Sequence, residues 1–280
     1  MLQYAFMQRA LLAAVLVGLT APTVGVHLVQ RRLALIGDGL GHIALAGVAI
    51  GVLTDTAPVL TALACATAGA VAIEVIRYRG NTSGDVALAI LFYGGIAGGV
   101  VIISQAPGGT PGNLNSYLFG AITTTTRGDV ITFALLSAVV LTVTVGLGRY
   151  LFAVSHDEEF ARASGLPVLA INLALAVVAA ITVVVSMRVV GLLLISALMI
   201  VPVATAQLVA RSFRSTVIVA VALGVIESVA GIWISYETDT PSGGTIVLTA
   251  IATFLLVAAA NGGRRLLENP PSNASGQVPT

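Results

Sequence analysis

Asp38 and His42 stand four residues apart in the apolar segment RRLALIGDGLGHIALAGVAIG, residues 31–51. A separation of four places two side chains on the same face of a helix. There a carboxylate and an imidazole can bind one divalent cation, such as zinc or manganese. A hydrogen bond between the two groups, which would hold the helix packing, is the structural alternative. Because a closed zinc site takes four ligands, a pair of ligands suits a site that must release its ion.

Other charged residues also fall within or beside apolar segments: Glu74, Asp85, Arg188 and Glu227. Such charges are costly, so each is a candidate functional residue. Glu74 precedes Arg77 by three positions and can pair with it. Asp85 suits the start of a helix, and the long side chain of Arg188 can reach an interface. Glu227 has no cation nearby in the sequence, which makes it a possible further metal ligand.

A short polar stretch at residues 156–166 separates two apolar segments. It concentrates the charged or titratable side chains His156, Asp157, Glu158, Glu159 and Arg162. Ser155 can cap a short helix here, and Gly165 with Pro167 would end it. An ordinary solvated loop is the alternative. We expect a short cytoplasmic helix that docks a soluble partner.

The composition indicates what kind of protein carries these residues. Of the 280 residues, 57% are hydrophobic and 9% are charged, and the mean hydropathy is +1.02. Soluble domains are about 25% charged, so the composition excludes a soluble enzyme and a disordered chain. A net charge of +1 excludes the basic surface of a nucleic-acid-binding protein. The chain is therefore expected to cross a membrane several times.

The chain contains no lysine, and its 13 Lys or Arg residues are all arginines. A Walker-type phosphate loop needs its lysine, so this chain cannot use ATP in that way, and Schiff-base catalysis on lysine is excluded as well. The single Cys65 excludes disulfide frameworks and cysteine-rich metal clusters.

We predict an all-α transmembrane bundle of about eight to nine spans, since one span needs about 20 apolar residues. The expected spans are 5–28, 33–54, 58–76, 86–104, 130–153, 168–187, 190–210, 216–235 and 244–262. Most arginines fall at alternate span ends, which predicts a cytoplasmic C-terminus. Residues 1–263 are expected to form one domain, with a short or re-entrant helix within 107–129. Residues 264–280 are expected to be a disordered cytoplasmic tail.

Many of the 30 glycines are spaced four residues apart within the expected spans. The pairs are Gly37 and Gly41, Gly47 and Gly51, Gly94 and Gly98, and Gly95 and Gly99. Small residues at this spacing let helices approach closely. The pattern predicts tight packing of a large bundle and identifies no substrate.

Four stretches of the chain resemble the ABC-3 family, the permease subunits of bacterial metal-uptake ABC transporters. The segment RRLALIGDGLGHIALAGVAIG resembles the family's second-helix segment with its Asp-x-x-x-His motif, and NLNSYLFGAI resembles the segment before the central helix. HDEEFARASGLP resembles the cytoplasmic coupling helix, in the pattern Glu159-x-Ala161-x-x-x-Gly165. VVGLLLISALMIVPVATAQLVARSF and DTPSGGTIVL resemble the C-terminal half. The departures are Gly39 and Gly41, where the family often has Ala or Ser, and Ala46, where it often has Pro.

The resemblance implies a multi-pass permease in the bacterial plasma (inner) membrane that forms a homodimer on two ATP-binding subunits. A metal-binding lipoprotein or periplasmic protein would deliver the cargo, zinc first and manganese second. Asp38 and His42 would line the path as metal ligands. The ATPase would be coupled through the 156–166 helix, by the residues Asp157, Glu158, Glu159, Ala161 and Gly165. No permanently bound cofactor and no enzymatic activity of the chain itself are expected.

Two rival functions share parts of this pattern. A proton-coupled secondary transporter would use Asp38, His42 and Glu227 as a relay, and would leave the polar 156–166 helix without a role. An ABC permease for a siderophore or a cobalamin-like ligand shares the general plan, but its path should be wider and depend less on a charged pair.

Overall fold

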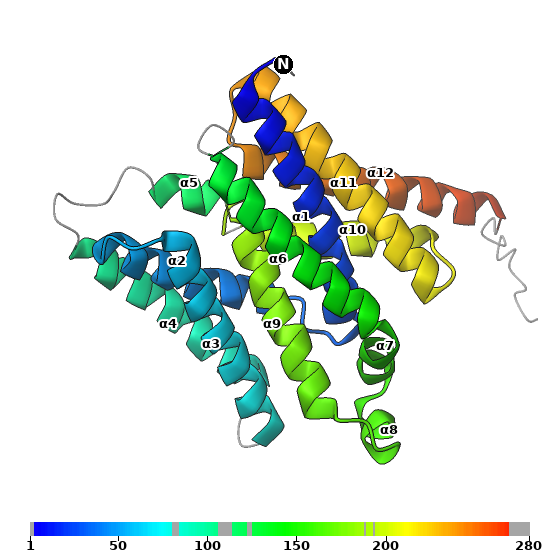
Figure 1. Cartoon of the computed structure of the whole chain (residues 1–280). Coiled ribbons are helices and arrows are strands. Elements are labelled where there is room, and N and C mark those ends of the chain that lie inside the picture. The colour runs from blue at the N-terminus through cyan, green and yellow to red at the C-terminus, as the bar shows by residue number, and fades with distance from the viewer. Residues whose placement is uncertain are drawn as a thin grey trace, which may run out of the picture.

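The computed structural model describes residues 3–79, 84–105, 114–121, 125–187, 189–192 and 194–268. Within these ranges the chain forms twelve α-helices and no β-strand (Figure 1). The helices are α1 Ala5–Gln30, α2 Ile36–Leu53, α3 Pro58–Arg79, α4 Gly84–Ser104, α5 Leu114–Phe119, α6 Arg127–Gly146, α7 Gly148–His156, α8 Glu158–Ala163, α9 Val168–Ser186, α10 Ile195–Val209, α11 Phe213–Thr238 and α12 Ser242–Glu268.

Eight of the nine expected spans each fall on one apolar helix, and the predicted all-α membrane bundle is confirmed. Seven helices of the described chain are long and apolar enough to cross a membrane, and two shorter apolar helices, Leu88–Ser104 and Ile195–Val209, fall on the remaining expected spans. The expected span 130–153 is wrong in one respect, because it is divided between α6 and α7 at Leu147. The glycines on either side of Leu147 weaken a continuous helix at this point.

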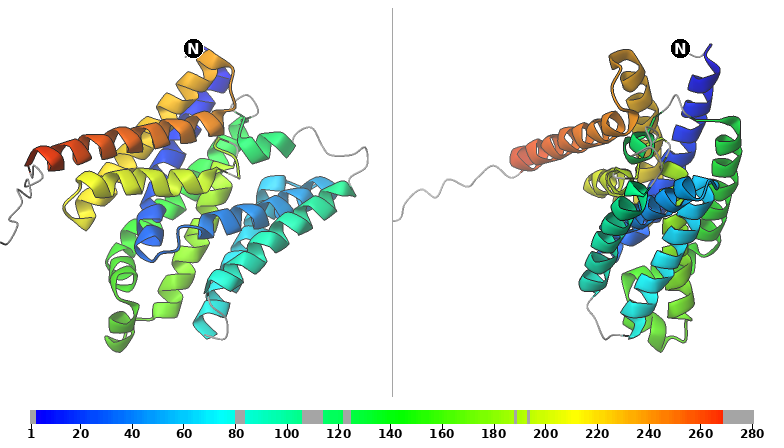
Figure 2. Two further views of the ribbon diagram at one scale, coloured as in Figure 1. Left: turned by 180° about the vertical axis from the view of Figure 1, so that it is seen from behind. Right: turned by 90° about the vertical axis from the view of Figure 1, so that its left-hand side faces the viewer.

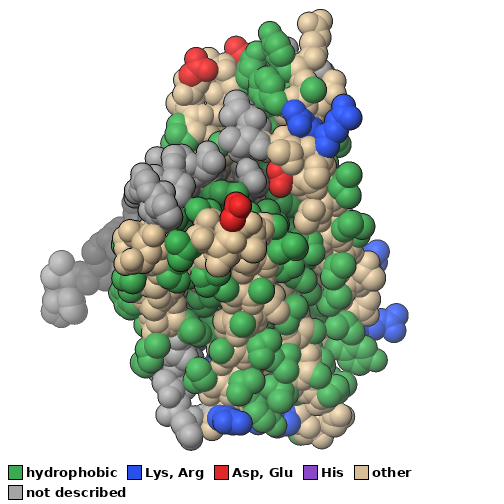
Figure 3. Space-filling view, turned by 60° about the vertical axis from the view of Figure 1, so that its left-hand side comes forward, with side chains coloured by type: hydrophobic (Ala, Val, Ile, Leu, Met, Phe, Trp, Pro, Cys, Tyr) green, Lys and Arg blue, Asp and Glu red, His purple; other side chains and the backbone are tan. Residues whose placement is uncertain are grey.

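The helices pack in two groups joined by α9. In Figure 1, α2, α3 and α4 lie together on the left, and α1, α10, α11 and α12 pack on one another on the right. Helix α9 contacts α1 and α6 as well as α2 and α3. Helices α1 and α9 are largely buried, whereas α6 and α12 are mostly exposed. Figure 2 shows α12 projecting from the side of the bundle, and Figure 3 shows a face with a mostly hydrophobic surface, as membrane contact requires.

The turn between α1 and α2 is closed by a Schellman motif. The amide of Leu33 donates to the carbonyl of Leu28 at 2.9 Å, and the amide of Arg32 donates to the carbonyl of Val29 at 3.1 Å. Arg32 occupies the left-handed position of the motif with a φ of 59°. Glycine is usual there, and another residue is strained by about 1–2 kcal/mol. The motif fixes the direction in which α2 leaves the end of α1.

A short helix in the central stretch was expected, and α5 provides it. Its carbonyl at Tyr117 accepts from the amide of Leu192 at 2.9 Å, in the irregular segment between α9 and α10. A side chain at Gly120 or Gly191, both at positive φ, would collide with the backbone of the other segment. Protein therefore covers this non-helical backbone, as a membrane requires. Residues 106–113 and 122–124 of the expected segment and its approach lie outside the described residues.

The C-terminal helix is longer than expected. Helix α12 continues to Glu268, so residues 264–268 are helical and the expected tail begins too early. The remainder, 269–280, lies outside the described residues, as does the candidate Arg188.

Candidate metal site

Helix α2 carries Asp38 and His42 along one side, where it packs against α4. Both side chains are half-buried. The His42 ring meets the edge of the Phe92 ring at a centroid distance of 4.3 Å. Asp38 and Phe92 line an open pocket of about 340 Å³, together with Leu35, Leu88, Ala89 and Tyr93. The two candidate ligands therefore lie one helical turn apart beside a hollow between two helices.

The polar atoms of this pair are not engaged with one another. The Nδ1 atom of His42 is buried and has no hydrogen-bond partner among the residues that the structure describes. Asp38 and His42, both in the described chain, share no hydrogen bond and no ion pair at the distances such contacts require. The structural alternative, an Asp–His hydrogen bond that holds the helix packing, is thus not formed. A buried nitrogen without a partner is rare in native proteins and calls for an explanation.

Gly95 sets the distance between the two helices. A Cβ atom at Gly95 would lie 2.7 Å from the backbone carbon of His42, so only glycine lets α4 approach α2 this closely. Gly99 also faces α2, at Ala46. Gly94 and Gly98 have no heavy atom within 4 Å of such a Cβ position and point away from the chain. The packing predicted from glycine spacing is therefore confirmed for one of the two pairs in α4 and not for the other.

Glu227 was expected as a possible further ligand, but the chain does not bring it to Asp38 and His42. It lies on α11, whose neighbours are α1, α10 and α12, whereas the neighbours of α2 are α3, α4, α9 and α10. In the described part of the chain no group of three or more His, Cys, Asp or Glu side chains is placed to hold a metal. Glu227 is nevertheless buried, and neither of its carboxylate oxygens has a partner within the described ranges.

The expected polar helix is present as α8, but it is shorter than residues 156–166 and is capped by a different residue. Helix α7 runs through Ser155 to His156, and Asp157 then breaks it with extended backbone. The Asp157 carboxylate accepts from the Phe160 amide at 2.8 Å, so Asp157 and not Ser155 is the cap. Aspartate caps as well as serine does, so two cap residues in sequence left the start of the helix ambiguous. Helix α8 ends at Ala163, and Gly165 terminates it as predicted, with a left-handed φ of 79°.

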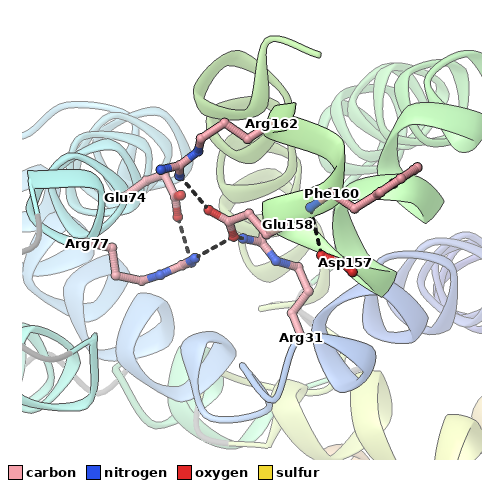
Figure 4. A network of polar contacts seen from close by, with 7 residues as sticks. All are labelled: Arg31, Glu74, Arg77, Asp157, Glu158, Phe160 and Arg162. Atoms are coloured by element: carbon pink, nitrogen blue, oxygen red, sulfur yellow. Dashed lines mark hydrogen bonds and ion pairs between the residues drawn. The ribbon is translucent and has the colours of Figure 1, made fainter. Parts of the chain in front are cut away.

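Glu158 connects α8 to two other helices (Figure 4). Its carboxylate contacts Arg31, at the end of α1, at 2.9 Å and Arg77, at the end of α3, at 3.5 Å. Arg162 on α8 itself contacts it at 3.2 Å. Arg77 also pairs with Glu74 at 2.9 Å, which confirms the pairing expected from their spacing. We call these five residues the Glu158 junction.

Part of the junction is shielded from water, whereas the Glu158 and Arg162 side chains are 32% and 61% exposed. The side chains of Arg31 and Glu74 are 6% and 3% exposed. Burial, and next the charge of Arg77, lower the pKa of Arg31, while Glu74 and Glu158 oppose that shift. The Arg31–Glu158 contact joins residues 127 positions apart, so local spacing gives no signal for it.

The arginine-rich ends that the sequence assigns to the cytoplasmic side lie together. The Glu158 junction joins the ends of α1 and α3 to α8. The Phe213 ring at the start of α11 lies 5.6 Å from His27 of α1 and 4.7 Å from Phe152 of α7. Helix ends that are far apart in the sequence therefore share one face of the bundle, as a consistent arginine bias predicts.

Comparison with known proteins identifies the family that has this architecture. The model of the ABC 3 transport family matches residues 3–261. The chain belongs to the ABC 3 transport family. The family resemblance predicted from four sequence stretches is thereby confirmed, and the chain is a multi-pass membrane permease of the bacterial ABC-transporter class.

Two relatives and one solved structure cover nearly the same length. The chain is 33% identical over 259 residues to the probable metal transport system membrane protein of Treponema pallidum, covering 92% of this chain and 97% of that protein. It is 32% identical over 256 residues to the manganese transport system membrane protein MntC of Halalkalibacterium halodurans, covering 91% and 87%. Its fold is similar to PsaBC from Streptococcus pneumoniae in complex with Fab, with a TM-score of 0.84, 31% identity and coverage of 95% and 96%.

Proposed function

We propose that this chain is the permease subunit of an ABC importer that carries a divalent metal ion inwards past Asp38 and His42. The observation that carries the proposal is the buried Nδ1 atom of His42, which has no partner among the described residues and lies one turn from Asp38, a residue that lines an open pocket. Imidazole and carboxylate groups are both ligands for zinc and manganese. Two protein ligands that are not otherwise engaged are able to take up an ion and then release it.

We propose manganese as the first cargo to test and zinc as the second, in the reverse of the order expected from the sequence. Ligand type alone does not separate the two ions, because both accept oxygen and nitrogen donors. The reversal rests on the relatives, since the MntC protein that shares 32% identity with this chain is named as part of a manganese transport system.

The proposal includes partners on both sides of the membrane. A chain without lysine has no Walker-type site, so ATP hydrolysis belongs to a separate subunit that docks at α8. In support, the Phe160 side chain at this short polar helix is 70% exposed, and exposed aromatic side chains are common at protein interfaces. A metal-binding lipoprotein or periplasmic protein would supply the ion from outside.

A second copy of the chain is the proposed source of the missing metal ligands. The outer side of α4 is exposed at Ile90 and Tyr93, next to the open positions Gly94 and Gly98. This side borders the pocket that Asp38 lines. A homodimer formed here would enclose the pocket between two permeases.

The test is metal uptake by cells that lack their own importers and express the chain with its ATPase and its binding protein. The wild type is expected to accumulate labelled manganese, with zinc as competitor, and Asp38→Ala and His42→Ala are expected to reduce uptake to background. Glu237→Gln, which removes an exposed acid from the end of α11, is the control and should transport normally. Full uptake by both site variants would refute the site, and uptake without the ATPase would favour the proton-coupled alternative.

A further inference from the structure

The Glu158 junction brings three arginines from three helices to a single carboxylate. Glu158 and Arg162 belong to α8, Arg31 ends α1, and Arg77 ends α3 (Figure 4). Helix α8 packs otherwise against α7 and α9. The ion pairs of Glu158 are therefore a direct connection from α8 to the helices that flank α2.

The contact with Arg31 leads to the start of α2. Arg31 is the C-cap of α1 and precedes Asp38 by seven residues. The Schellman motif at Arg32 and Leu33 closes the turn, and the amide of Ile36 donates to the carbonyl of Leu33 at 3.0 Å. These successive hydrogen bonds connect the end of α1, at Arg31, to the first turn of α2, which carries Asp38.

The contact with Arg77 connects Glu158 to the surroundings of the pocket that Asp38 lines. Arg77 and Arg32 line a small cavity of about 80 Å³ that includes Leu35 and Leu88. These two leucines also line the pocket of Asp38. The junction thus borders the candidate path between Asp38 and the arginine-rich face.

The burial of Arg31 makes its contact with Glu158 resistant to separation. The Arg31 side chain is 6% exposed, and Glu158 is its closest ion-pair partner. A buried charge that loses its partner is strongly destabilised. When α8 moves, Arg31 must therefore follow Glu158 or leave its buried site for water.

We propose that Glu158 is a positioning residue that transmits movement of α8 to the metal site on α2, mainly through Arg31 and secondly through Arg77. This inference rests on the proposed function, in which an ATPase docks at α8. Glu158 touches no metal. Its role is to make α8 and the start of α2 move together, so that ATP hydrolysis is converted into release of the ion.

The experiment uses the complete complex of permease, ATPase and metal-binding protein in liposomes, and measures metal ions transported per ATP hydrolysed. Glu158→Gln and Arg31→Gln should each lower this ratio at least about tenfold, a typical size for coupling between sites. The ATPase rate and the amount of ATPase that co-purifies should remain close to the wild type. The double variant should be no worse than the more damaged single variant, because both changes break the same contact.

Two further variants separate coupling from folding. Arg79→Gln removes an arginine two residues after Arg77 that is exposed and forms no ion pair within the described chain, and it should leave the ratio within about twofold of the wild type. Arg31→Lys keeps the charge and should retain more coupling than Arg31→Gln.

The outcomes are distinct. A wild-type ratio in Glu158→Gln would overturn the inference and leave the proposed function intact. Losses that multiply in the double variant, or loss of ATPase co-purification, would also overturn it, since they indicate independent roles or simple docking. A wild-type complex that moves no metal would refute the proposed function itself.

Discussion

The Asp38–His42 site lies on α2, whereas the Glu158 junction joins the ends of α1 and α3 to α8. The polar groups of the two regions differ in how many partners they have. In the described part of the chain, His42 has a buried nitrogen without a partner and Asp38 makes no ion pair. In the junction, by contrast, Glu158 accepts from three arginines and Arg77 contacts two acids. A site that must take up and release an ion needs free ligands, whereas a connection between helices needs its charges held. The difference distinguishes residues proposed to bind the metal ion from residues proposed to couple the movements of helices.

The largest effect is expected from Asp38→Asn, which keeps the shape of the side chain and removes its charge. Metal uptake should fall about tenfold or more, as is typical when a metal's ligand environment is disturbed. The midpoint of thermal unfolding in detergent should not change, because the carboxylate makes no hydrogen bond to any described residue. A lower midpoint with normal uptake would place Asp38 among the structural residues and remove the contrast between the two regions.

A loss of stability, which is not expected for Asp38→Asn, is expected for Glu74→Gln in the junction. The Glu74 side chain is 3% exposed and pairs with Arg77, so loss of its charge should lower the free energy of unfolding by about 1–3 kcal/mol. Glu237→Gln, on an exposed acid, is the comparison and should stay within about 0.5 kcal/mol of the wild type. Equal stability of the two variants would show that the buried pair contributes nothing.

A pair of neighbouring glycines tests whether the site depends on the distance between α2 and α4. Gly95→Ala places a Cβ atom 2.7 Å from the His42 backbone, and such overpacking typically costs about 1–3 kcal/mol. Uptake should therefore fall several-fold. Gly94→Ala meets nothing within 4 Å in the same chain and should leave the stability of the single chain unchanged. Normal uptake by Gly95→Ala would show that the spacing of these helices is not critical.

The smallest effect is expected where only the backbone is involved. Gly165 ends α8 at a φ of 79° and has open space around it, so Gly165→Ala should destabilise the protein by about 1 kcal/mol through the left-handed backbone alone. Gly148→Ala, also in open space but in the first turn of α7, should have the opposite sign, because alanine favours a helix. Unfolding in detergent measures both, and equal signs would contradict this account.

The contrast between the regions also explains what could be predicted from the sequence. Asp38 with His42 and Glu74 with Arg77 are close in sequence, so helical spacing alone brought each pair to one face. The contact between Arg31 and Glu158 depends on the packing of α1 against the segment around α8, and no local pattern encodes it. Arg31 was interpreted only as an indicator of membrane orientation, although a buried arginine must have an acidic partner.

The apolar helices were predicted well for a physical reason, and their ends less well. A membrane span needs a long apolar run, which is visible in the sequence even when its packing is not. The break at Leu147 and the cap at Asp157 depend on local backbone preferences of a few tenths to about 1 kcal/mol, and neighbouring residues competed for both positions. Glu227 lies on α11, whose packing partners are α1, α10 and α12, and a position within a span does not show which helix a residue faces.

Arg32 has a consequence for how the chain is made. Glycine would adopt the left-handed backbone of this position without strain. The positive charge of Arg32 therefore comes with a local loss of stability in the folded turn. Arginines that flank early spans direct which way those spans are inserted. The residue that strains the finished turn can therefore act during synthesis, when the hairpin of α1 and α2 takes its orientation in the membrane.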